Sequence, residues 1–168
     1  MKTTDINDIE SIINIAHSMM FHKHGNVLYS GQSQDSEYFV QNIDELRYRN
    51  PKNTPVELHD TINNVAYDKF GVLIRNGLFA TTKIKEASEY GNVYRIFPIS
   101  DDYSVFTNPN IPDLTFEINK RKGNDHESFI DDYVDGIIET KKTIYSVEYM
   151  VFGKVLFIRN DLYDSINY

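Results

Sequence analysis

A glutamate inside an apolar segment near the C-terminus is the residue best suited to chemistry. Glu148 lies in the run 147–152 (VEYMVF), whose β-branched and aromatic residues predict a strand. Burying a carboxylate costs free energy unless it is paired or faces a cleft. Strand alternation places Glu148, Met150 and Phe152 on one face. We interpret Glu148 as a carboxylate that rigid strands hold in a cleft. The alternative is an edge strand with this side chain in solvent.

Two other segments combine a glycine with residues that could hold a ligand. In the run 28–32 (LYSGQ), a short buried strand leads into Gly31, whose backbone can approach a ligand closely. The alternative is an ordinary turn at a strand end. In the run 77–82 (GLFATT), a strand edge feeds a short helix that ends at Tyr90. Here the alternative is core packing of Phe79 against Tyr90.

Standard catalytic and nucleotide-binding motifs do not occur in the sequence. A Walker A motif, a Gly-rich dinucleotide fingerprint, a Gly-x-Ser-x-Gly elbow and a His-Glu-x-x-His motif are all missing. His22 and His24 lack the spacing of a good chelate, so we expect no metal site. Because the chain has no cysteine, a disulfide framework, a zinc ribbon and a thiol nucleophile are excluded.

Length and composition are typical of one globular domain. We interpret residues 1–168 as a single domain, since 40% hydrophobic residues suffice for one core. The net charge of −8 argues against binding to duplex nucleic acid, because phosphates require a basic stripe. We expect no membrane partner and a cytoplasmic location, since no apolar run approaches about 20 residues and the N-terminus lacks a signal peptide. Richness in Asn, Ile, Lys and Tyr is typical of AT-rich genomes, such as those of phages and low-GC bacteria.

The predicted helices and strands alternate irregularly. We expect an amphipathic helix over about the first twenty residues, a helix from the capping box at 54–57 to Gly71, a short helix ending at Tyr90, and a helix from Asp125 to about Ile138. Strands are expected at 27–29, 78–80, 93–99 and 103–107, with a terminal hairpin of 144–152 and 155–158 around Gly153. The segments 32–53 and 108–125 are expected to be loops. This mixture without regular βαβ units predicts the α+β class.

The order of the three ligand-holding segments resembles the ADP-ribosyltransferase superfamily, most closely the branch of the poly-ADP-ribose polymerases and diphtheria toxin. That family has the motifs Leu-aromatic-His-Gly, Gly-Ile-Tyr-Phe-Ala leading to Ala-x-Tyr, and Glu-Tyr-hydrophobic-Val-aromatic. The counterparts here are 28–31, 77–80 leading to Tyr90, and 148–152, and the resemblance spans residues 27–158. It implies an ADP-ribosyltransferase-like fold with two small antiparallel sheets around an NAD cleft and flanking helices.

The resemblance also implies roles for individual residues, with NAD as co-substrate. Gly31 would hold the nicotinamide amide through its backbone, Tyr90 would stack on the nicotinamide ring, and catalytic Glu148 would hydrogen-bond the nicotinamide ribose. The residues implied to contact NAD are Tyr29, Ser30, Gly31, Phe79, Ala80, Thr81 and Tyr90. Breaking the glycosidic bond of NAD develops oxocarbenium-like positive charge, which a fixed carboxylate stabilises.

Three positions depart from the family pattern. Ser30 replaces the His that grips the adenosine ribose, and Phe79 replaces a Tyr. Ser146, two residues before Glu148, argues against the arginine-modifying type, which has an acid or amide there.

Three hypotheses stay open. The first is a mono-ADP-ribosyltransferase, a phage or bacterial effector that modifies a macromolecular acceptor, with protein favoured over nucleic acid. The second is a catalytically inactive relative that binds or inhibits a protein partner stoichiometrically. The third is a small α+β domain without any ancestral site.

Overall fold

The computed structural model describes residues 11, 14, 27–111, 113–121, 126–141, 144 and 146–166. Its elements along the chain are β1 (Leu28–Gln32), β2 (Tyr38–Ile43), α3 (Val56–Phe70), the 3-10 turn η1 (Ile74–Asn76), β3 (Leu78–Thr81), α4 (Ile84–Ser88), β4 (Asn92–Pro98), β5 (Ser104–Thr107), α5 (Leu114–Lys120), α6 (His126–Asp135), β6 (Ile138–Glu139), β7 (Glu148–Arg159) and α7 (Asn160–Ile166). The predicted N-terminal helix lies outside the described residues. The α+β class is confirmed.

The long strand β7 connects the whole sheet. The seven described strands form one antiparallel sheet in the order β3-β1-β4-β7-β5-β6, with β2 also paired to β7. The first half of β7 pairs with β3 and β5, and its second half pairs with β2 and β4. The expectation of two separate sheets is therefore corrected, because β7 belongs to both halves. Since β3 pairs with β7 as well as with β1, the strands β3, β1, β4 and β7 close a circuit.

Gly153 marks the point where β7 changes its partners. The predicted hairpin around Gly153 is wrong, since the strand continues through it. The glycine has φ +96°, a conformation that L side chains rarely adopt, and it lies opposite Ile43 at the end of β2. A local distortion of this kind bends one strand without reversing it, so each half can face different neighbours.

Two segments predicted as loops contain regular structure. Within 32–53, the residues of β2 pair along β7, although only Ile43 among them is fully buried. Within 108–125, the residues of α5 form a helix whose N-cap, Asp113, accepts a hydrogen bond from the Phe116 amide at 2.9 Å. Neither segment has a strong apolar period, so the prediction failed where pairing or capping alone defines the element.

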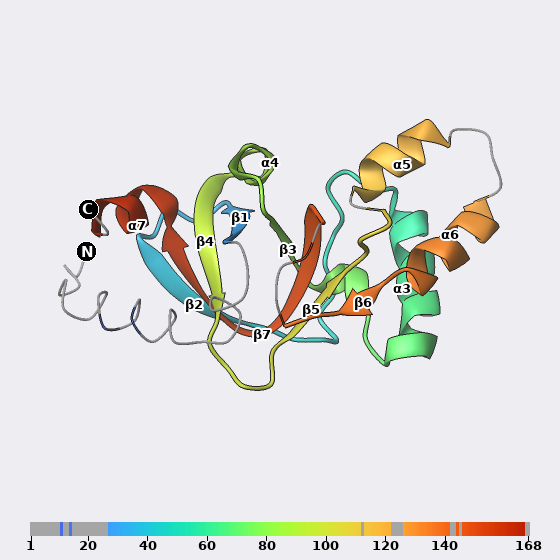
Figure 1. Ribbon diagram of the computed structural model, residues 1–168, viewed down its shortest axis with the longest axis horizontal. Coiled ribbons are helices and arrows are strands. Elements are labelled where there is room, and N and C mark those ends of the chain that lie inside the picture. Colours follow the sequence, from blue (N-terminus) through green and yellow to red (C-terminus); the bar gives the residue numbers. More distant parts are fainter. Residues whose placement is uncertain are drawn as a thin grey trace.

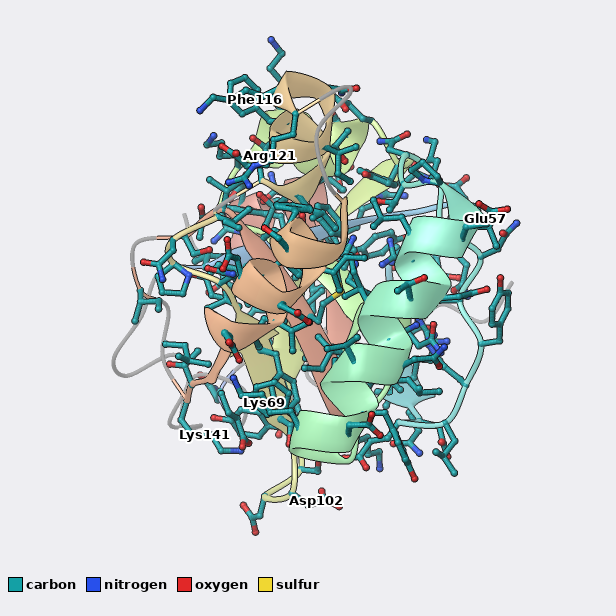
Figure 2. The ribbon with its side chains drawn as sticks, turned by 90° about the vertical axis from the view of Figure 1, so that its right-hand side faces the viewer. Glu57, Lys69, Asp102, Phe116, Arg121 and Lys141 are labelled. Atoms are coloured by element: carbon teal, nitrogen blue, oxygen red, sulfur yellow. The ribbon has the colours of Figure 1, made fainter. Side chains whose placement is uncertain are left out.

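Helix α3 begins and ends close to the predicted positions. Gly71 ends it in a left-handed conformation, φ +70°, and the predicted capping box does not form because the N-cap position falls on Pro55 without a side-chain bond. Glu57 in the first turn and Lys69 in the last turn suit the helix dipole. Figure 2 shows these two side chains at opposite ends of α3.

Helices lie at both ends of the sheet, while α4 packs against β1, β3 and β4 between them (Figure 1). Figure 1 shows α3, α5 and α6 grouped at one end of the molecule and α7 at the other. The main core joins β7 to α3 and α6, and its fully buried members include Phe129, Tyr149 and Phe152. Each such side chain contributes roughly 1.5–3 kcal/mol, so the sheet is a rigid support for anything at the start of β7. No helix among the described residues is long and apolar enough to cross a membrane.

Candidate functional site

Segments that are far apart in the sequence meet at the start of β7. Thr81 of β3 lies opposite Glu148, and Phe79 lies opposite Met150. The hydroxyl of Ser30 donates a hydrogen bond to the Phe79 carbonyl at 2.8 Å, which ties β1 to β3. The three motif segments identified from the sequence therefore form one continuous region of the molecule.

Gly31 allows the end of α4 to lie directly on β1. A Cβ atom at Gly31 would lie 2.0 Å from the Ala87 carbonyl oxygen and 2.7 Å from the Tyr90 Cβ. Any side chain at this position would therefore clash with backbone atoms. The close approach places Tyr90 beside Phe79, with ring centroids 5.0 Å apart and the planes tilted by 36°. The aromatic pair thus depends on a glycine in β1.

Two adjoining cavities share the aromatic pair as a common wall. The first, about 140 Å³, is acidic and is lined by Asn53, Phe79, Glu86, Glu89, Tyr90, Asp113, Thr115, Val147 and Glu148. The second, about 280 Å³, is basic and is lined by Ser30, Gly31, Gln32, Ser33, Gln41, Arg47, Arg49, Asn50, Lys52, Leu78, Phe79 and Tyr90. Together they reach the size of small-molecule sites, and they present opposite charges on either side of one wall.

The basic cavity receives its charge from residues 47–53, which we call the strap. Lys52 places its ammonium 4.8 Å from the centroid of the Tyr90 ring. Asn53 donates a hydrogen bond to the Tyr90 hydroxyl at 3.0 Å. Burial, followed by the charge of Glu148, raises the pKa of Tyr90, so its hydroxyl stays neutral at neutral pH. The strap therefore crosses the aromatic pair and contacts it through polar groups.

Two arginines fasten the strap to η1. Arg47 donates from Nε to the Asn76 carbonyl at 2.9 Å, and the Arg49 amide donates to the Asn76 side chain at 3.4 Å. The Arg49 guanidinium lies 5.8 Å from the centroid of the Phe79 ring. Burial and the nearby charge of Arg75 lower the pKa of Arg49 to about 10, so it is still cationic at pH 7.

Glu148 forms an ion pair with Arg75. Its Oε1 accepts from Arg75 Nη1, while the Leu114 amide lies 3.5 Å from Oε2, at the limit of a hydrogen bond. Only 6% of the Arg75 side chain and 13% of the Glu148 side chain are exposed. Burial lowers the pKa of Arg75, but the charge of Glu148 and a bond to Tyr133 outweigh it and raise that pKa above its usual value. Glu148 is thus a paired carboxylate and not a solvent-exposed one.

Side chains of helix α3 hold the backbone of Arg75. The Arg75 amide donates to Asn63 Oδ1 at 2.7 Å, and His59 Nε2 lies 3.2 Å from the Arg75 carbonyl. Asn63 also donates to the side chain of Asn76 at 3.0 Å. His59 and Asn63 are both buried, on the face of α3 for which the sequence pattern predicted apolar contacts. The buried side of this helix therefore carries a polar patch that orients η1.

Ser30 and Tyr29, both implied to contact NAD, have different surroundings. Ser30 is buried, donates to Phe79 and accepts from Gln32 Nε2 at 2.9 Å. Its hydroxyl is therefore used within the sheet, although the residue borders the basic cavity. Tyr29 lines neither of the two cavities, and its ring centroid lies 5.8 Å from the Arg95 guanidinium.

Ala80 and Thr81 lie in the interior behind the site. Both are fully buried, and neither lines the acidic or the basic cavity. Thr81 donates from Oγ1 to Glu86 Oε2 at 3.0 Å and accepts from the Lys83 amide at 3.1 Å, which fixes the start of α4. The structure thus places Ser30, Gly31, Phe79, Tyr90 and Glu148 along the cavities, and Ala80 and Thr81 behind them.

Sequence reasoning missed the cationic residues of the site. Arg75 directly follows the apolar run 72–74, so the logic that singled out Glu148 also applies to it. Arg49 and Lys52 lie in a polar segment where nothing in the sequence distinguishes them from solvent-exposed residues. Within the part of the chain that the structure describes, no group of three or more His, Asp or Glu side chains could hold a metal ion.

Comparison with known proteins finds no family model, no curated protein and no solved structure that matches this chain.

Proposed function

We propose that this chain is an NAD-dependent mono-ADP-ribosyltransferase with a divergent ADP-ribosyltransferase-like fold, acting in the cytoplasm on a macromolecular acceptor, protein rather than nucleic acid. The observation that supports it is the convergence of the three motif segments on one wall, with Gly31, Phe79, Tyr90 and Glu148 in contact with the cavities. These are the positions to which the resemblance assigns contacts with the nicotinamide ring and its ribose.

The charges on either side of the wall suit the parts of NAD. The nicotinamide ring of NAD is cationic and would lie against an aromatic face beside carboxylates. The diphosphate is anionic and would be attracted to Arg47, Arg49 and Lys52 in the basic cavity.

Strands β1 and β3 pair at one position only, Tyr29 with Thr81. Gly31 lies beyond this pair, and it borders the basic cavity. On its side facing away from Val93 of β4, the Gly31 peptide group would bind the carboxamide of a nicotinamide ring stacked on Tyr90, which lines both cavities.

Glu148 would stabilise the positive charge that develops on the ribose as the glycosidic bond breaks. A preorganised carboxylate in a partly dry site is effective because it does not have to reorganise during the reaction. Glu148 fits this requirement because its side chain is only 13% exposed. The residue also begins β7, a strand that pairs with β3 on one side and β5 on the other. Departure of nicotinamide is assisted if the aromatic pair holds the ring and excludes water.

Two observations favour a second function, that of a catalytically inactive protein which binds or inhibits a protein partner stoichiometrically. The ion pair with Arg75 neutralises the charge of Glu148, and the Ser30 hydroxyl bonds to Phe79 where the family has a His for the ribose. Under this hypothesis the cavities would bind NAD without turnover, or bind none.

Release of nicotinamide and transfer of label from labelled NAD distinguish the two functions. In Glu148→Gln, a nearly isosteric change, we expect turnover to fall by about 10²–10³, the usual loss when a charge-stabilising group is removed. Glu139→Gln, an exposed strand carboxylate of β6, is the matched control and should keep wild-type turnover. Absence of turnover together with absence of NAD binding by calorimetry would refute the proposed enzyme.

A further inference from the structure

The arginine that pairs with Glu148 is held at several points. Its amide bonds to Asn63, its carbonyl lies in contact with His59, and its Nη1 donates to the Tyr133 hydroxyl at 3.3 Å as well as to Glu148. Contacts from α3 and α6 thus fix both the backbone and the guanidinium of Arg75. A carboxylate paired with so immobile a cation is restricted to one position as well.

Stability does not explain why these groups are charged and polar. An ion pair as buried as that of Arg75 and Glu148 loses about as much hydration free energy as it gains in attraction, and an apolar pair of similar volume is often as stable or more stable. His59 and Asn63 are 0% and 4% exposed, and their side chains bond to η1 rather than packing with the apolar core. These charged and polar residues therefore serve to fix the positions of the Arg75 and Glu148 side chains more than to stabilise the fold.

The geometry assigns different tasks to the two oxygens of Glu148. Oε1 is engaged by Arg75, whereas Oε2 lies 3.5 Å from the Leu114 amide, at the limit of a hydrogen bond. Glu148 lines the acidic cavity together with Asp113 and Thr115, the two neighbours of Leu114, so the contact of Oε2 with the Leu114 amide lies on the side of that cavity.

We infer that Arg75 is a positioning residue: by holding Oε1 it presents Oε2 of Glu148 to the ribose of the substrate, and His59 and Asn63 set the place of Arg75. This inference rests on the proposed function, in which Glu148 acts on NAD. It adds that the reaction requires a second residue, which does not touch the substrate and lies outside the three motif segments.

Kinetics of nicotinamide release test the inference in the full chain. Arg75→Met should lower kcat by about 100-fold with little change in KM, because misplacement of a catalytic group by about 1 Å costs that much. Arg75→Lys retains the charge and should recover part of the lost rate. Arg95→Met is the matched control, since Arg95 forms a partly buried ion pair with Asp164 of α7 and lines neither cavity. A wild-type kcat in Arg75→Met would overturn the inference.

A spectroscopic measurement separates this inference from the proposed function. The ¹³C resonance of the Glu148 carboxyl group, assigned by its loss in Glu148→Gln, should be displaced or broadened in Arg75→Met and unchanged in Arg95→Met. If the wild type neither turns over nor binds NAD, the proposed function fails, but a displaced resonance still supports positioning by Arg75. An unmoved resonance overturns it with or without turnover. If Arg75→Met does not fold, the same measurements on Arg75→Lys decide, with a displaced resonance expected.

Discussion

Replacing Gly31 by alanine tests whether the contact between β1 and α4 builds the aromatic wall. The added Cβ would lie 2.0 Å from the Ala87 carbonyl oxygen, whereas ordinary contacts are 3.4 Å or longer. Both contacting groups are backbone or Cβ atoms, so no flexible side chain can move aside. The end of α4 must shift by about 1 Å, as overpacked sites generally do.

The size of the effect follows from this shift. Overpacking typically costs about 1–3 kcal/mol. For a domain of this length, each kcal/mol lowers Tm by about 2–4 °C, so we expect a loss of about 2–12 °C. Tyr90 moves with α4 because its amide donates to the Ala87 carbonyl at 3.0 Å. The spacing of 5.0 Å between Tyr90 and Phe79 would then be lost, and NAD binding with it.

Thermal unfolding by circular dichroism and NAD binding by calorimetry measure the two consequences of Gly31→Ala. The control is Gly71→Ala, where the new Cβ has no atom within 4 Å but the backbone is left-handed at φ +70°. That change should cost about 1–2 kcal/mol and leave NAD affinity intact, since only the local conformation is strained. Wild-type stability and wild-type NAD affinity in Gly31→Ala would refute the reasoning about this contact.

Two further predictions concern charge and ionisation. Burial raises the pKa of Tyr133 to about 12. The neutral hydroxyl therefore contributes fully to the free energy of unfolding below pH 10, and this contribution is lost as pH rises from 10 to 12. In urea unfolding, the free energy of unfolding of Tyr133→Phe should fall less between these pH values than that of the wild type, by about 2–3 kcal/mol at most. In the strap, Arg49→Gln with Lys52→Gln should raise the KM for NAD about tenfold and leave kcat unchanged, because contacts with the diphosphate bind substrate and transition state equally. The exposed Lys85→Gln on α4 is the control for the strap variant, and an unchanged KM in the double variant would contradict the assignment of the basic cavity.

Local patterns were sufficient for the elements that surround the motifs. The apolar period of α3 and the glycine after it predicted that helix, and β-branched and aromatic runs predicted β1, β3, β4 and β5. Glu148 could be selected from the sequence because a carboxylate in an apolar strand needs a special environment wherever it lies. These features depend on neighbours within a few residues, which the sequence specifies directly.

Features that depend on distant partners could not be predicted in this way. β2 exists because β7 offers it a free edge, and Gly153 bends one strand where a local pattern suggested a hairpin. Arg75 is known as the partner of Glu148 only from the fold, which brings η1 to the start of β7. The carboxylate with which the sequence analysis began is therefore half of an ion pair, because residues 73 positions apart share one buried place in the structure.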